Sequence, residues 1–497
     1  MKAAVVGAGW AGLAAALRLR ELGWETTLFE AGREPGGRAR SVDSATLGMR
    51  IDNGQHILLG AYTETLALMR ELGIDPEQRL QRLGLGLRSA DGRYRLQAWP
   101  RLPRPLHLLA GIATARGLGW PDRCALAALM RRLQRQLWQT PPAATVEQWL
   151  RAECQSDRLM RRFWRPLCLA ALNTAPQEAC AQLLAHVLRD SLGGPRSASD
   201  MLLPRTGLSE LWPADAAALL DIRYGHAVRR LAWFPTHVEL DGMAFDAAIL
   251  ASNVPVAQRL LRQCPSDAAG GLPAGRALRD ARAPGSTVPG GTDSTAGTPR
   301  CAAAERTLSG AAFLDELDAF DYRPIATLTL RLARPWNLPW PMLMLEDDPA
   351  RDWHGQWLFE RPPPRPGIAA APGMPDGAGS PDAPPAATVV VSDARTAAQL
   401  SRTDLAAGIQ AQLRAQSAAL PPMPEVIASE LLVDKRATFA AVPGLARPGN
   451  ATPWPRIWVA GDWTDTGYPA VLEGAVRSGR RAAALAVSAL AGGRSTQ

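Results

Sequence analysis

Lysine is nearly absent from this 497-residue chain: apart from Lys2 and Lys435, all of the 55 Lys and Arg residues are arginine. The six cysteines include no CxxC pair, and none lies near a histidine at the spacing of metal ligands. We therefore expect free, buried thiols and no metal site. No dense basic block and no zinc-finger spacing is present either, which argues against a nucleic-acid partner despite the net charge of +8.

Long apolar runs are missing as well. No stretch of about 18 uninterrupted apolar residues occurs, so the sequence predicts no transmembrane helix. The first apolar run, AAVV, begins at Ala3, which leaves no room for the charged and apolar regions of a signal peptide. We therefore expect a cytoplasmic protein that at most makes peripheral contact with the inner membrane.

Two segments are poor in the large apolar side chains that a core requires. Residues 265–304 are dense in Gly, Ala, Pro, Ser and Thr, and residues 361–388 are richer still in Pro and Gly. Segments of this composition cannot bury enough apolar surface to order themselves. We interpret them as surface insertions, at 261–310 and 361–388, in a chain whose length and 47% hydrophobic content are typical of two or three globular domains.

The N-terminal 30 residues contain a complete dinucleotide-binding pattern. The apolar run AAVV predicts a buried parallel strand, and Gly7, Gly9 and Gly12 follow it directly before a helix-forming segment. Such glycines permit the tight turn, the close approach of a pyrophosphate and the close packing of helix on strand. A second strand, TTLFE, ends at Glu30, where an acid accepts hydrogen bonds from an adenosine ribose. This order of features predicts a Rossmann-like domain.

Two further motifs identify the dinucleotide. The element Gly36-Gly37-Arg38 resembles the flavoprotein extension of the amine oxidase, phytoene desaturase and protoporphyrinogen oxidase superfamily. At the other end of the chain, AGDWTDTGYPAVLEGAVRSG (460–479) resembles the C-terminal flavin motif of the same superfamily. The resemblance implies FAD as the cofactor, with the paired glycines and Arg38 at its phosphates. The residues that it implies near the ribityl chain and the flavin ring are Gly461, Asp462, Glu473, Gly474 and Ala475.

A third segment completes the cofactor domain. Residues 224–255 alternate like antiparallel strands, end in an apolar strand, and resemble the superfamily segment that lays backbone groups near Val228 against the adenine. We therefore expect an α/β fold with a discontinuous Rossmann-like FAD-binding domain and a second, α+β substrate-binding domain, as in amine oxidases. The FAD-binding domain is assigned to residues 1–90, 203–260 and 425–497. The second domain is assigned to a mostly helical segment, 91–202, and a sheet segment, 311–424.

One predicted helix of the second domain, RCALAALMRRLQRQLW, carries an apolar stripe at helical spacing. The stripe consists of Leu126, Leu129, Met130, Leu133 and Leu137. Arginines flank it and interrupt the apolar segment before it, and this pattern suits a lipid interface. Packing of the stripe within its own domain is the alternative interpretation.

Four stretches resemble one family more closely, the hydroxysqualene dehydroxylases, also described as squalene-associated FAD-dependent desaturases. They are DNGQHILLGAY (52–62), FWRPLCLAALNT (163–174), DKRATFAAVPG (434–444) and AGDWTDTGYPAVLEGAVRSG (460–479). The resemblance covers nearly the whole chain except the insertions. It implies a bacterial enzyme that converts hydroxysqualene, a polyprenyl substrate, to squalene for hopanoid synthesis, with an external electron donor that reduces the flavin.

Loss of an allylic hydroxyl requires a proton donor, because hydroxide is a poor leaving group. His56 is the first candidate, since it titrates near neutral pH and lies in the family-specific DNGQH element. Gln55 is expected to orient it or to contact the flavin, Tyr468 is a second candidate donor, and Asn173 is expected to contact the substrate hydroxyl. A purely structural histidine is the competing interpretation of His56.

Three other functions fit parts of the same pattern. A carotenoid or phytoene desaturase would use the scaffold oxidatively. An amine oxidase of this fold usually holds a lysine near the flavin, and neither Lys2, in the first strand, nor Lys435 suits that position. A flavin-stabilised scaffold protein that hands precursors to a partner enzyme would bind the flavin without turnover.

Overall fold

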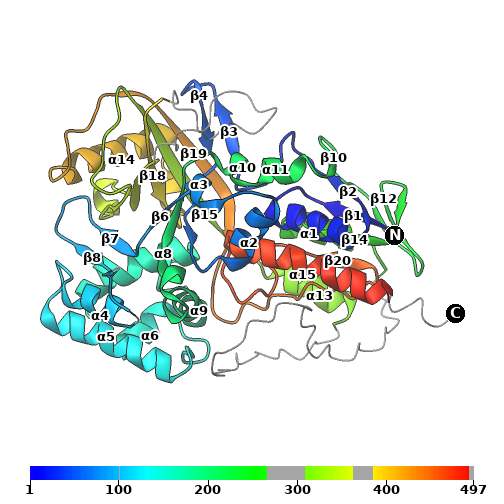
Figure 1. The fold of residues 1–497 in the computed structure, drawn as a ribbon, viewed down its shortest axis with the longest axis horizontal. Helices are drawn as coiled ribbons and strands as arrows, with labels where there is room; N and C mark the ends of the chain where they lie inside the picture. Colours follow the sequence, from blue (N-terminus) through cyan, green and yellow to red (C-terminus); the bar gives the residue numbers. More distant parts are fainter. Residues whose placement is uncertain (100, 104, 266–307, 362–383, 492–497) are drawn as a thin grey trace, which may run out of the picture.

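The predicted parallel sheet is built from three distant parts of the chain (Figure 1). A computed structural model describes residues 1–99, 101–103, 105–265, 308–361 and 384–491, so most of both predicted insertions lies outside the described residues. The sheet has the order β10-β2-β1-β14-β20, and every pairing is parallel. Its strands are β1 (Lys2–Val6), β2 (Glu25–Phe29), β10 (Asp221–Arg223), β14 (Ala247–Leu250) and β20 (Ile457–Val459). The cofactor domain is therefore discontinuous, as the sequence predicts.

Both faces of this sheet are covered, because β1 contributes alternate residues to two different hydrophobic clusters. One cluster includes α1 (Trp10–Glu21) and α15 (Leu472–Ala491), and the other includes α12 (Val254–Leu261) and α13 (Gly310–Asp318). An antiparallel meander precedes β14, as the alternation in 224–255 predicts. Its strands are β11 (Leu231–Trp233), β12 (Val238–Leu240) and β13 (Met243–Phe245).

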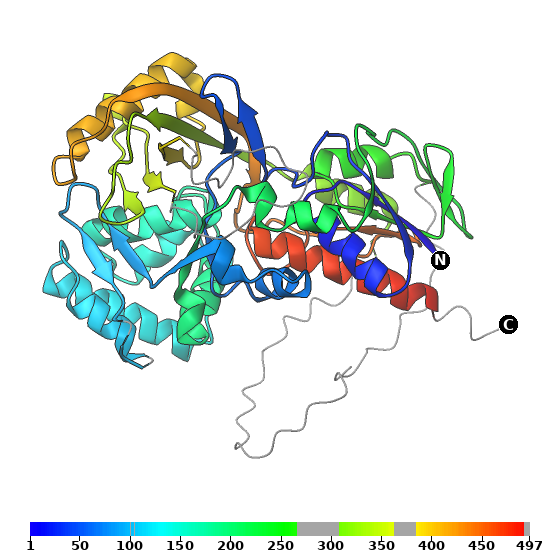
Figure 2. The ribbon, with the colours of Figure 1, turned by 45° about the horizontal axis from the view of Figure 1, so that its top comes forward.

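A second, antiparallel sheet has the order β16-β17-β18-β15-β19. Its strands are β15 (Tyr322–Leu332), β16 (Met342–Met344), β17 (Trp357–Glu360), β18 (Ala386–Val391) and β19 (Val426–Phe439). The helix α14 (Arg402–Gln416) shares a hydrophobic cluster with one face of this sheet. The other face shares a cluster with the helical segment, so the second domain has three layers. Figure 2 shows this domain and the parallel sheet as two lobes.

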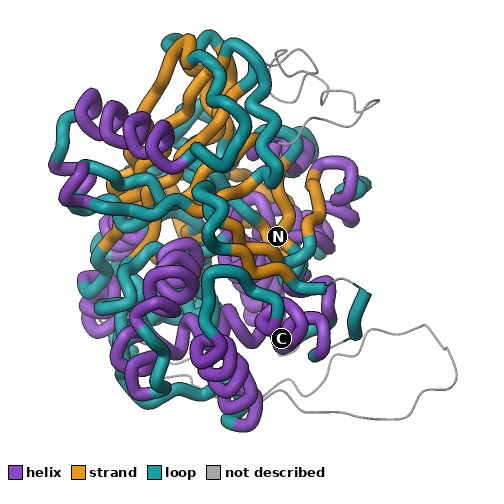
Figure 3. The backbone as a smooth tube through the Cα atoms, turned by 90° about the vertical axis from the view of Figure 1, so that its left-hand side faces the viewer, coloured by secondary structure: helices purple, strands orange, loops and turns teal. Residues whose placement is uncertain are grey.

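The segment predicted to be mostly helical forms the layer below the second sheet in Figure 3. Its helices are α4 (Leu106–Ala113), α5 (Trp120–Arg135), α6 (Val146–Ala152), α7 (Asp157–Leu159), the π-helical turn Met160–Trp164, α8 (Arg165–Leu172) and α9 (Ala181–Leu188). The apolar stripe of α5 packs inside this layer, with Leu126, Leu129 and Leu133 at most 2% exposed. These three leucines therefore belong to the core, as the packing interpretation predicts, whereas Leu137 is 64% exposed.

Short elements connect the two domains. The remaining helices are α2 (Thr63–Glu71), α3 (Pro76–Arg79), α10 (Leu208–Leu211) and α11 (Pro213–Ala217). The remaining strands are β3 (Ser41–Ser44), β4 (Met49–Asp52), β5 (Leu58–Leu59), β6 (Leu80–Leu83), β7 (Gly86–Arg88), β8 (Arg95–Gln97) and β9 (Met201–Pro204). Among the described residues, no helix has the length and apolar character needed to cross a membrane.

Three expectations from the sequence differ from the observed structure. The strand β19 pairs along β15 as far as Phe439, although the sequence assigned everything from 425 onward to the cofactor domain. Alternation shows that a segment is a strand but not which sheet it joins. The residues Ala386–Thr388, assigned to an insertion, begin β18. Of the cysteines, Cys124 and Cys154 are exposed free thiols rather than buried ones.

Candidate functional site

The turn after β1 is packed so tightly that Gly7 and Gly12 cannot carry side chains. A Cβ on Gly12 would lie 1.8 Å from the Gly7 carbonyl oxygen. Gly9 is the N-cap residue of α1, so the free N–H groups of the first helical turn begin there. These are the features that let a dinucleotide pyrophosphate approach a helix N-terminus.

The element Gly36-Gly37 lies against this turn. The Gly36 amide donates to the Ala8 carbonyl oxygen at 2.8 Å, and a Cβ on Gly37 would lie 3.0 Å from the Gly9 Cα. Gly37 also has a φ of +63°, which side chains rarely adopt. The structure thus brings together all five predicted glycines of the N-terminal motif.

Glu30 sits at the end of β2 beside the glycine turn. Its two carboxylate oxygens accept hydrogen bonds from the amides of Ala8 and Gly32, both at 2.7 Å. A carboxylate has about four acceptor positions, so Glu30 keeps capacity for ribose hydroxyls. The His226 amide donates to the Glu30 carbonyl oxygen at 2.9 Å, which places the segment before Val228 beside it. The Val228 carbonyl oxygen accepts from the Arg259 guanidinium at 2.8 Å, and this contact occupies one of the backbone groups predicted to meet the adenine.

Arg38 and Asp462 join the two flavin motifs across 424 residues of sequence. The Arg38 Nη2 donates to the Asp462 Oδ1 at 2.6 Å. Burial alone would lower the pKa of Arg38, but Asp462 outweighs it and raises the pKa. The guanidinium therefore stays charged, and the ion pair brings a cation for phosphates and an anion for hydroxyls to one place.

A buried arginine that sequence analysis did not identify holds the C-terminal motif in shape. Arg447 donates to the carbonyl oxygens of Asp462 at 2.8 Å and Tyr468 at 2.5 Å. It also donates to the Trp463 and Thr464 carbonyl oxygens. Burial lowers the pKa of Arg447 to about 10, so it remains a cation at neutral pH. No spacing marks this residue, because its partners are backbone atoms of a loop.

The helix α15 begins where the predicted Glu473-Gly474-Ala475 element lies. Glu473 is fully buried, and its carboxylate accepts from the amides of Glu64 and Thr65 at 3.0 Å, from the Thr65 hydroxyl and from Arg477. It therefore anchors the N-terminus of α2, and this side chain is directed at protein donors. Next to it, a Cβ on Gly474 would meet the Thr466 hydroxyl at 3.2 Å. The Gly461 amide donates to the Ser478 hydroxyl at 3.0 Å, so the Gly-Asp pair is tied to α15.

His56 lies in the same neighbourhood as Arg38. The Asn53 amide group donates to the Arg38 carbonyl oxygen at 3.2 Å, so the DNGQH element runs beside the arginine. The His56 Nδ1 contacts the Gly54 carbonyl oxygen at 3.2 Å. Burial lowers the pKa of His56, and the Gly54 carbonyl and Asp52 only partly oppose this. Gln55, next to it, is half-buried.

Tyr468 lies on another side of the C-terminal motif. Its ring faces the Arg477 guanidinium at 5.0 Å. Burial raises the pKa of Tyr468, and a hydrogen bond to Asp190 raises it further. The phenol is therefore protonated throughout the neutral range. Its partners Asp190 and Arg477 lie just after α9 and within α15.

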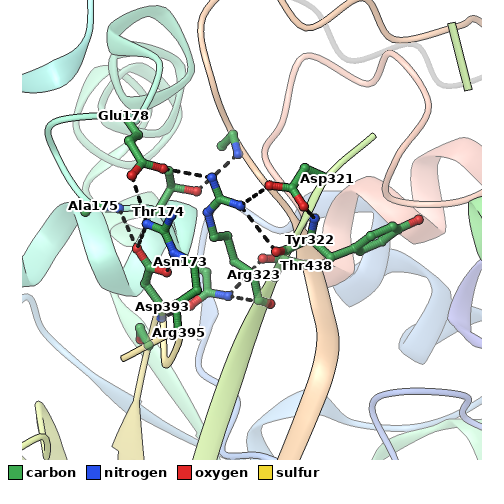
Figure 4. Close-up of polar contacts among 12 residues, drawn as sticks. Asn173, Thr174, Ala175, Glu178, Asp321, Tyr322, Arg323, Asp393, Arg395 and Thr438 are labelled. Carbon is green, nitrogen blue, oxygen red and sulfur yellow. Dashed lines mark hydrogen bonds and ion pairs between the residues drawn. The ribbon is translucent and has the colours of Figure 1, made fainter. Parts of the chain in front are cut away.

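Asn173 occupies a polar network that joins the helical layer to one end of the second sheet, where β15 begins and β18 and β19 end (Figure 4). Its amide nitrogen donates to the Arg323 carbonyl oxygen at 3.3 Å and to the Thr438 hydroxyl at 2.9 Å, while its oxygen accepts from the Asp393 amide at 2.6 Å. Both amide hydrogens are used, so Asn173 has none left for a substrate hydroxyl. Its oxygen accepts one hydrogen bond and keeps a second lone pair for a hydroxyl donor, so the predicted contact with the substrate stays a prediction.

Charged side chains complete this network. Glu178 accepts from Arg323 at 2.8 Å and from Arg395 at 3.0 Å, and Arg395 also pairs with Asp393 at 2.7 Å (Figure 4). The Arg323 side chain is only 6% exposed, so its charge requires these partners.

Tyr322, the first residue of β15, is a further site residue without a sequence signal. Burial raises its pKa to about 12, and the charges of Arg38 and Asp462 act on it. The Arg436 guanidinium lies 5.9 Å from its ring. An aromatic side chain thus stands between the second sheet and the joined flavin motifs.

These features define a class: a two-domain flavoprotein whose nucleotide site is assembled from both ends of the chain. The family model for flavin containing amine oxidoreductases matches residues 10–289 and 286–487, and the chain belongs to that family. It is an FAD-dependent oxidoreductase. The glycine turn and the joined Arg38–Asp462 pair fit FAD by geometry and charge.

Individual relatives agree with this assignment. The chain is 28% identical to a hydroxysqualene dehydroxylase of Rhodopseudomonas palustris, over 98% of both proteins. It is 26% identical to a hydroxysqualene dehydroxylase of Sinorhizobium fredii, over 97% of this chain and 98% of the relative. Among solved structures, an oxidoreductase from Methanosarcina mazei superposes with a TM-score of 0.63 at 15% identity, over 97% of this chain and 99% of that one. The last likeness concerns the fold alone.

Proposed function

We propose that this FAD-dependent oxidoreductase removes the hydroxyl of hydroxysqualene reductively and releases squalene. Similarity to hydroxysqualene dehydroxylases over 98% of the chain supports the substrate. The structural observation that carries the proposal is the ion pair of Arg38 with Asp462, because it joins both flavin motifs beside the DNGQH element. The proposal includes an external donor that reduces the flavin and a peripheral contact with a membrane, into which a polyprenyl substrate partitions.

The reaction breaks one C–O bond and forms one C–H bond. The hydroxyl accepts a proton and leaves as water, and a hydride adds to the carbon atom that carried it. Bound reduced FAD supplies the hydride, and the external donor returns two electrons. The protein must therefore deliver one proton at the departing oxygen and keep water away from the allylic carbon.

We propose His56 as the residue that delivers this proton, with Gln55 orienting it. A neutral imidazole that donates its Nδ1 hydrogen to the Gly54 carbonyl oxygen has only an acceptor at Nε2. His56 must therefore act as the imidazolium ion. Because burial lowers its pKa, the imidazolium is the minor form at neutral pH and a strong acid when present.

Tyr468 is the alternative donor. Its raised pKa keeps the hydrogen on the phenol but makes the phenol a weaker acid than an unperturbed tyrosine. Asn173 is left with a positioning role, since it holds the helical layer to β15 and β19 through Arg323 and Thr438.

A cavity of about 300 Å³ between the helical layer and the second sheet is a candidate path for the apolar chain. Its lining is mixed: Leu169, Met344 and Leu345 are apolar, and the charged lining residues are Asp91, Arg93, Arg161, Arg162, Arg165, Glu346 and Asp347. The buried Tyr94 also lines it, and among the described residues its hydroxyl has no hydrogen-bond partner. We propose that part of the polyprenyl chain occupies this cavity.

The test is anaerobic mixing of photoreduced holoprotein with hydroxysqualene. We expect reoxidation of the flavin, followed at 450 nm, in step with formation of squalene detected by mass. Oxidised holoprotein that is instead reduced by phytoene, or by an amine, would assign a desaturase or an amine oxidase. A flavin unchanged by all three compounds would leave a scaffold protein and overturn the proposed reaction.

A further inference from the structure

The helix α4 is apolar but poorly covered by the rest of the protein. Of its sequence, LHLLAGIA, only His107, Gly111 and Ile112 are buried. Leu106 is 51% exposed and Leu109 is 38% exposed. Since burial of apolar area is the main favourable term in folding, an apolar helix left open to this extent points to an additional contact.

Two tryptophans lie at the ends of this helix. The Trp99 amide donates to the His107 carbonyl oxygen at 3.0 Å, and its indole donates to the Thr114 hydroxyl at 3.2 Å. Trp99 therefore folds back along α4 and is 48% exposed. Trp120 opens α5 and is 68% exposed, the largest value among the exposed large hydrophobic residues in the described part of the chain.

The first turn of α5 is fastened to the C-terminal end of α4. Arg123 donates to the Ala113 and Ala115 carbonyl oxygens, both at 2.6 Å. This brings Trp120, three residues earlier, next to the end of α4. We call Trp99, Leu106, Leu109 and Trp120 the α4 surface. Figures 1 and 2 place α4 and α5 at the outer edge of the helical layer, far from both termini.

The charges around the α4 surface have one sign. Between Trp99 and Leu137 the chain has a single acidic residue, Asp122. Asp122 is buried, and its carboxylate accepts from the Gly119 amide at 3.0 Å and the Ser156 hydroxyl at 2.6 Å. The same stretch contains seven arginines: Arg101, Arg104, Arg116, Arg123, Arg131, Arg132 and Arg135. Arg123 binds backbone carbonyl oxygens and Arg132 pairs with Glu153 at 2.8 Å, and the other arginines leave this stretch with an excess of positive charge.

We propose that the α4 surface docks on a bilayer that contains anionic phospholipids. Exposed tryptophan and leucine side chains suit the boundary between headgroups and acyl chains, and arginines suit the lipid phosphates. A second copy of the chain would bring two cationic surfaces together, which disfavours self-association through this face. A nucleic acid would complement the arginines but not the apolar centre.

The docking surface also adjoins the candidate path for the substrate. Arg162, which lines the 300 Å³ cavity, donates to the Gly117 carbonyl oxygen at 3.0 Å. Gly117 lies in the loop between α4 and α5. A lipid-soluble molecule that left the bilayer at the α4 surface would thus meet the cavity nearby. This inference specifies the membrane contact of the proposed function, and the docking itself is independent of which reaction the flavin carries out.

The experiment is co-sedimentation of the FAD-loaded full chain with vesicles of phosphatidylcholine, with and without about one third phosphatidylglycerol. We expect binding to the anionic vesicles that weakens as salt is raised. Leu106→Glu with Leu109→Glu should lower the bound fraction at least tenfold, while flavin content and melting temperature stay unchanged. The matched control is Leu219→Glu, since Leu219 is 48% exposed on the cofactor domain. It should bind as the unaltered protein does.

A second pair of variants separates charge from apolar contact. Arg101→Gln with Arg116→Gln should reduce binding to anionic vesicles only. The inference is overturned if the unaltered protein binds no vesicle, or if Leu219→Glu weakens binding as much as the α4 changes. Dimerisation of the protein that is abolished by Leu106→Glu would assign the surface to a second copy instead. Turnover of detergent-dispersed hydroxysqualene should be the same in all these variants, so a failed docking test is distinct from a failed reaction.

Discussion

The glycine turn of the cofactor domain and the Asn173 network of the second domain are built from different kinds of contact. In the cofactor domain, backbone meets backbone: a Cβ on Gly12 would lie 1.8 Å from the Gly7 carbonyl oxygen, and one on Gly479 would lie 2.1 Å from that of Ala11. The second domain has a backbone contact of this kind too, since a Cβ on Gly408 would lie 2.3 Å from the Asp352 carbonyl oxygen, but in its polar network side chains from distant segments meet, as Asn173 does with Thr438. Contacts of the first kind require glycine at fixed positions and so leave a pattern in the sequence. Contacts of the second kind leave none.

This difference divides the two tasks of the enzyme. We expect the nucleotide to lie on the close backbone contacts, so changes there should remove the flavin. The side-chain networks hold the substrate-side layers in place, so changes there should leave the flavin bound and affect stability or turnover. Flavin absorbance and turnover, measured on the same variants, test whether the two kinds of contact have these separate effects.

The largest effect is expected for Gly12→Val. The added side chain would overlap the Gly7 carbonyl oxygen, so the turn after β1 cannot keep its shape. We expect protein without 450 nm absorbance even after incubation with excess FAD. Gly84→Ala is the control, because a Cβ there meets no atom within 4 Å, and it should retain the flavin. A yellow Gly12→Val protein would refute the backbone-contact account.

Next in size is Arg447→Met. It removes donors to the carbonyl oxygens of Asp462, Thr464 and Tyr468 and leaves them buried without partners. We expect the dissociation constant of FAD, measured by fluorescence titration, to rise at least tenfold. Arg414→Met, at an exposed position of α14, is the control and should not change it. Equal affinities of the two variants would show that Arg447 does not shape the flavin site.

A smaller effect is expected for Asn173→Gly. Asn173 has a left-handed φ of 47°, which glycine tolerates, so the substitution removes the amide without adding backbone strain. Loss of its hydrogen bonds should lower the free energy of unfolding by about 1–3 kcal/mol, with flavin absorbance unchanged. The control is Asn337→Gly, an exposed asparagine with a φ of 59°. Denaturation with urea compares the free energies of unfolding of the two variants. Loss of flavin in Asn173→Gly would contradict the expectation that changes in the second domain leave the flavin bound.

The smallest expected effect concerns the proton donor. If the His56 imidazolium delivers the proton, the rate must fall as pH rises through the lowered pKa of His56, that is, already below about 6.5. If Tyr468 delivers it, the rate stays level through neutral pH, because burial raises the pKa of that phenol. Single-turnover flavin reoxidation between pH 5 and 9 distinguishes the two. His56→Gln should remove the pH dependence and Tyr468→Phe should preserve it.

The sequence predicted the cofactor domain in considerable detail. The glycine spacing, Glu30 and the Gly36-Gly37-Arg38 element gave the first strand, helix and turn, and the structure places all of these together. The roles assigned to individual site residues stay predictions. For two of these residues, Glu473 and Asn173, the structure shows side chains that form hydrogen bonds within the protein.

No sequence signal marked Arg447 or Tyr322, and the sequence left open whether the stripe of α5 meets lipid or packs inside its own domain. Arg447 binds carbonyl oxygens, which every residue has, so no residue pattern reveals its partners. Hydrophobic periodicity marked α5, whose Leu126, Leu129 and Leu133 are buried. In the described part of the chain, Leu106 and Leu109 of α4 are 51% and 38% exposed. Periodicity reports that a helix has an apolar face but not what covers that face.

By itself, then, the amino-acid sequence determined the close-packed glycine turn after β1, since steric exclusion at a few backbone positions is a local requirement, and its resemblance to a flavoprotein superfamily indicated the flavin. Only the tertiary structure decided which sheet β19 joins, which arginine supports the C-terminal turn, and which helix remains uncovered. Those outcomes depend on contacts between segments hundreds of residues apart, and the free energy of such contacts is fixed by the packing of the whole chain.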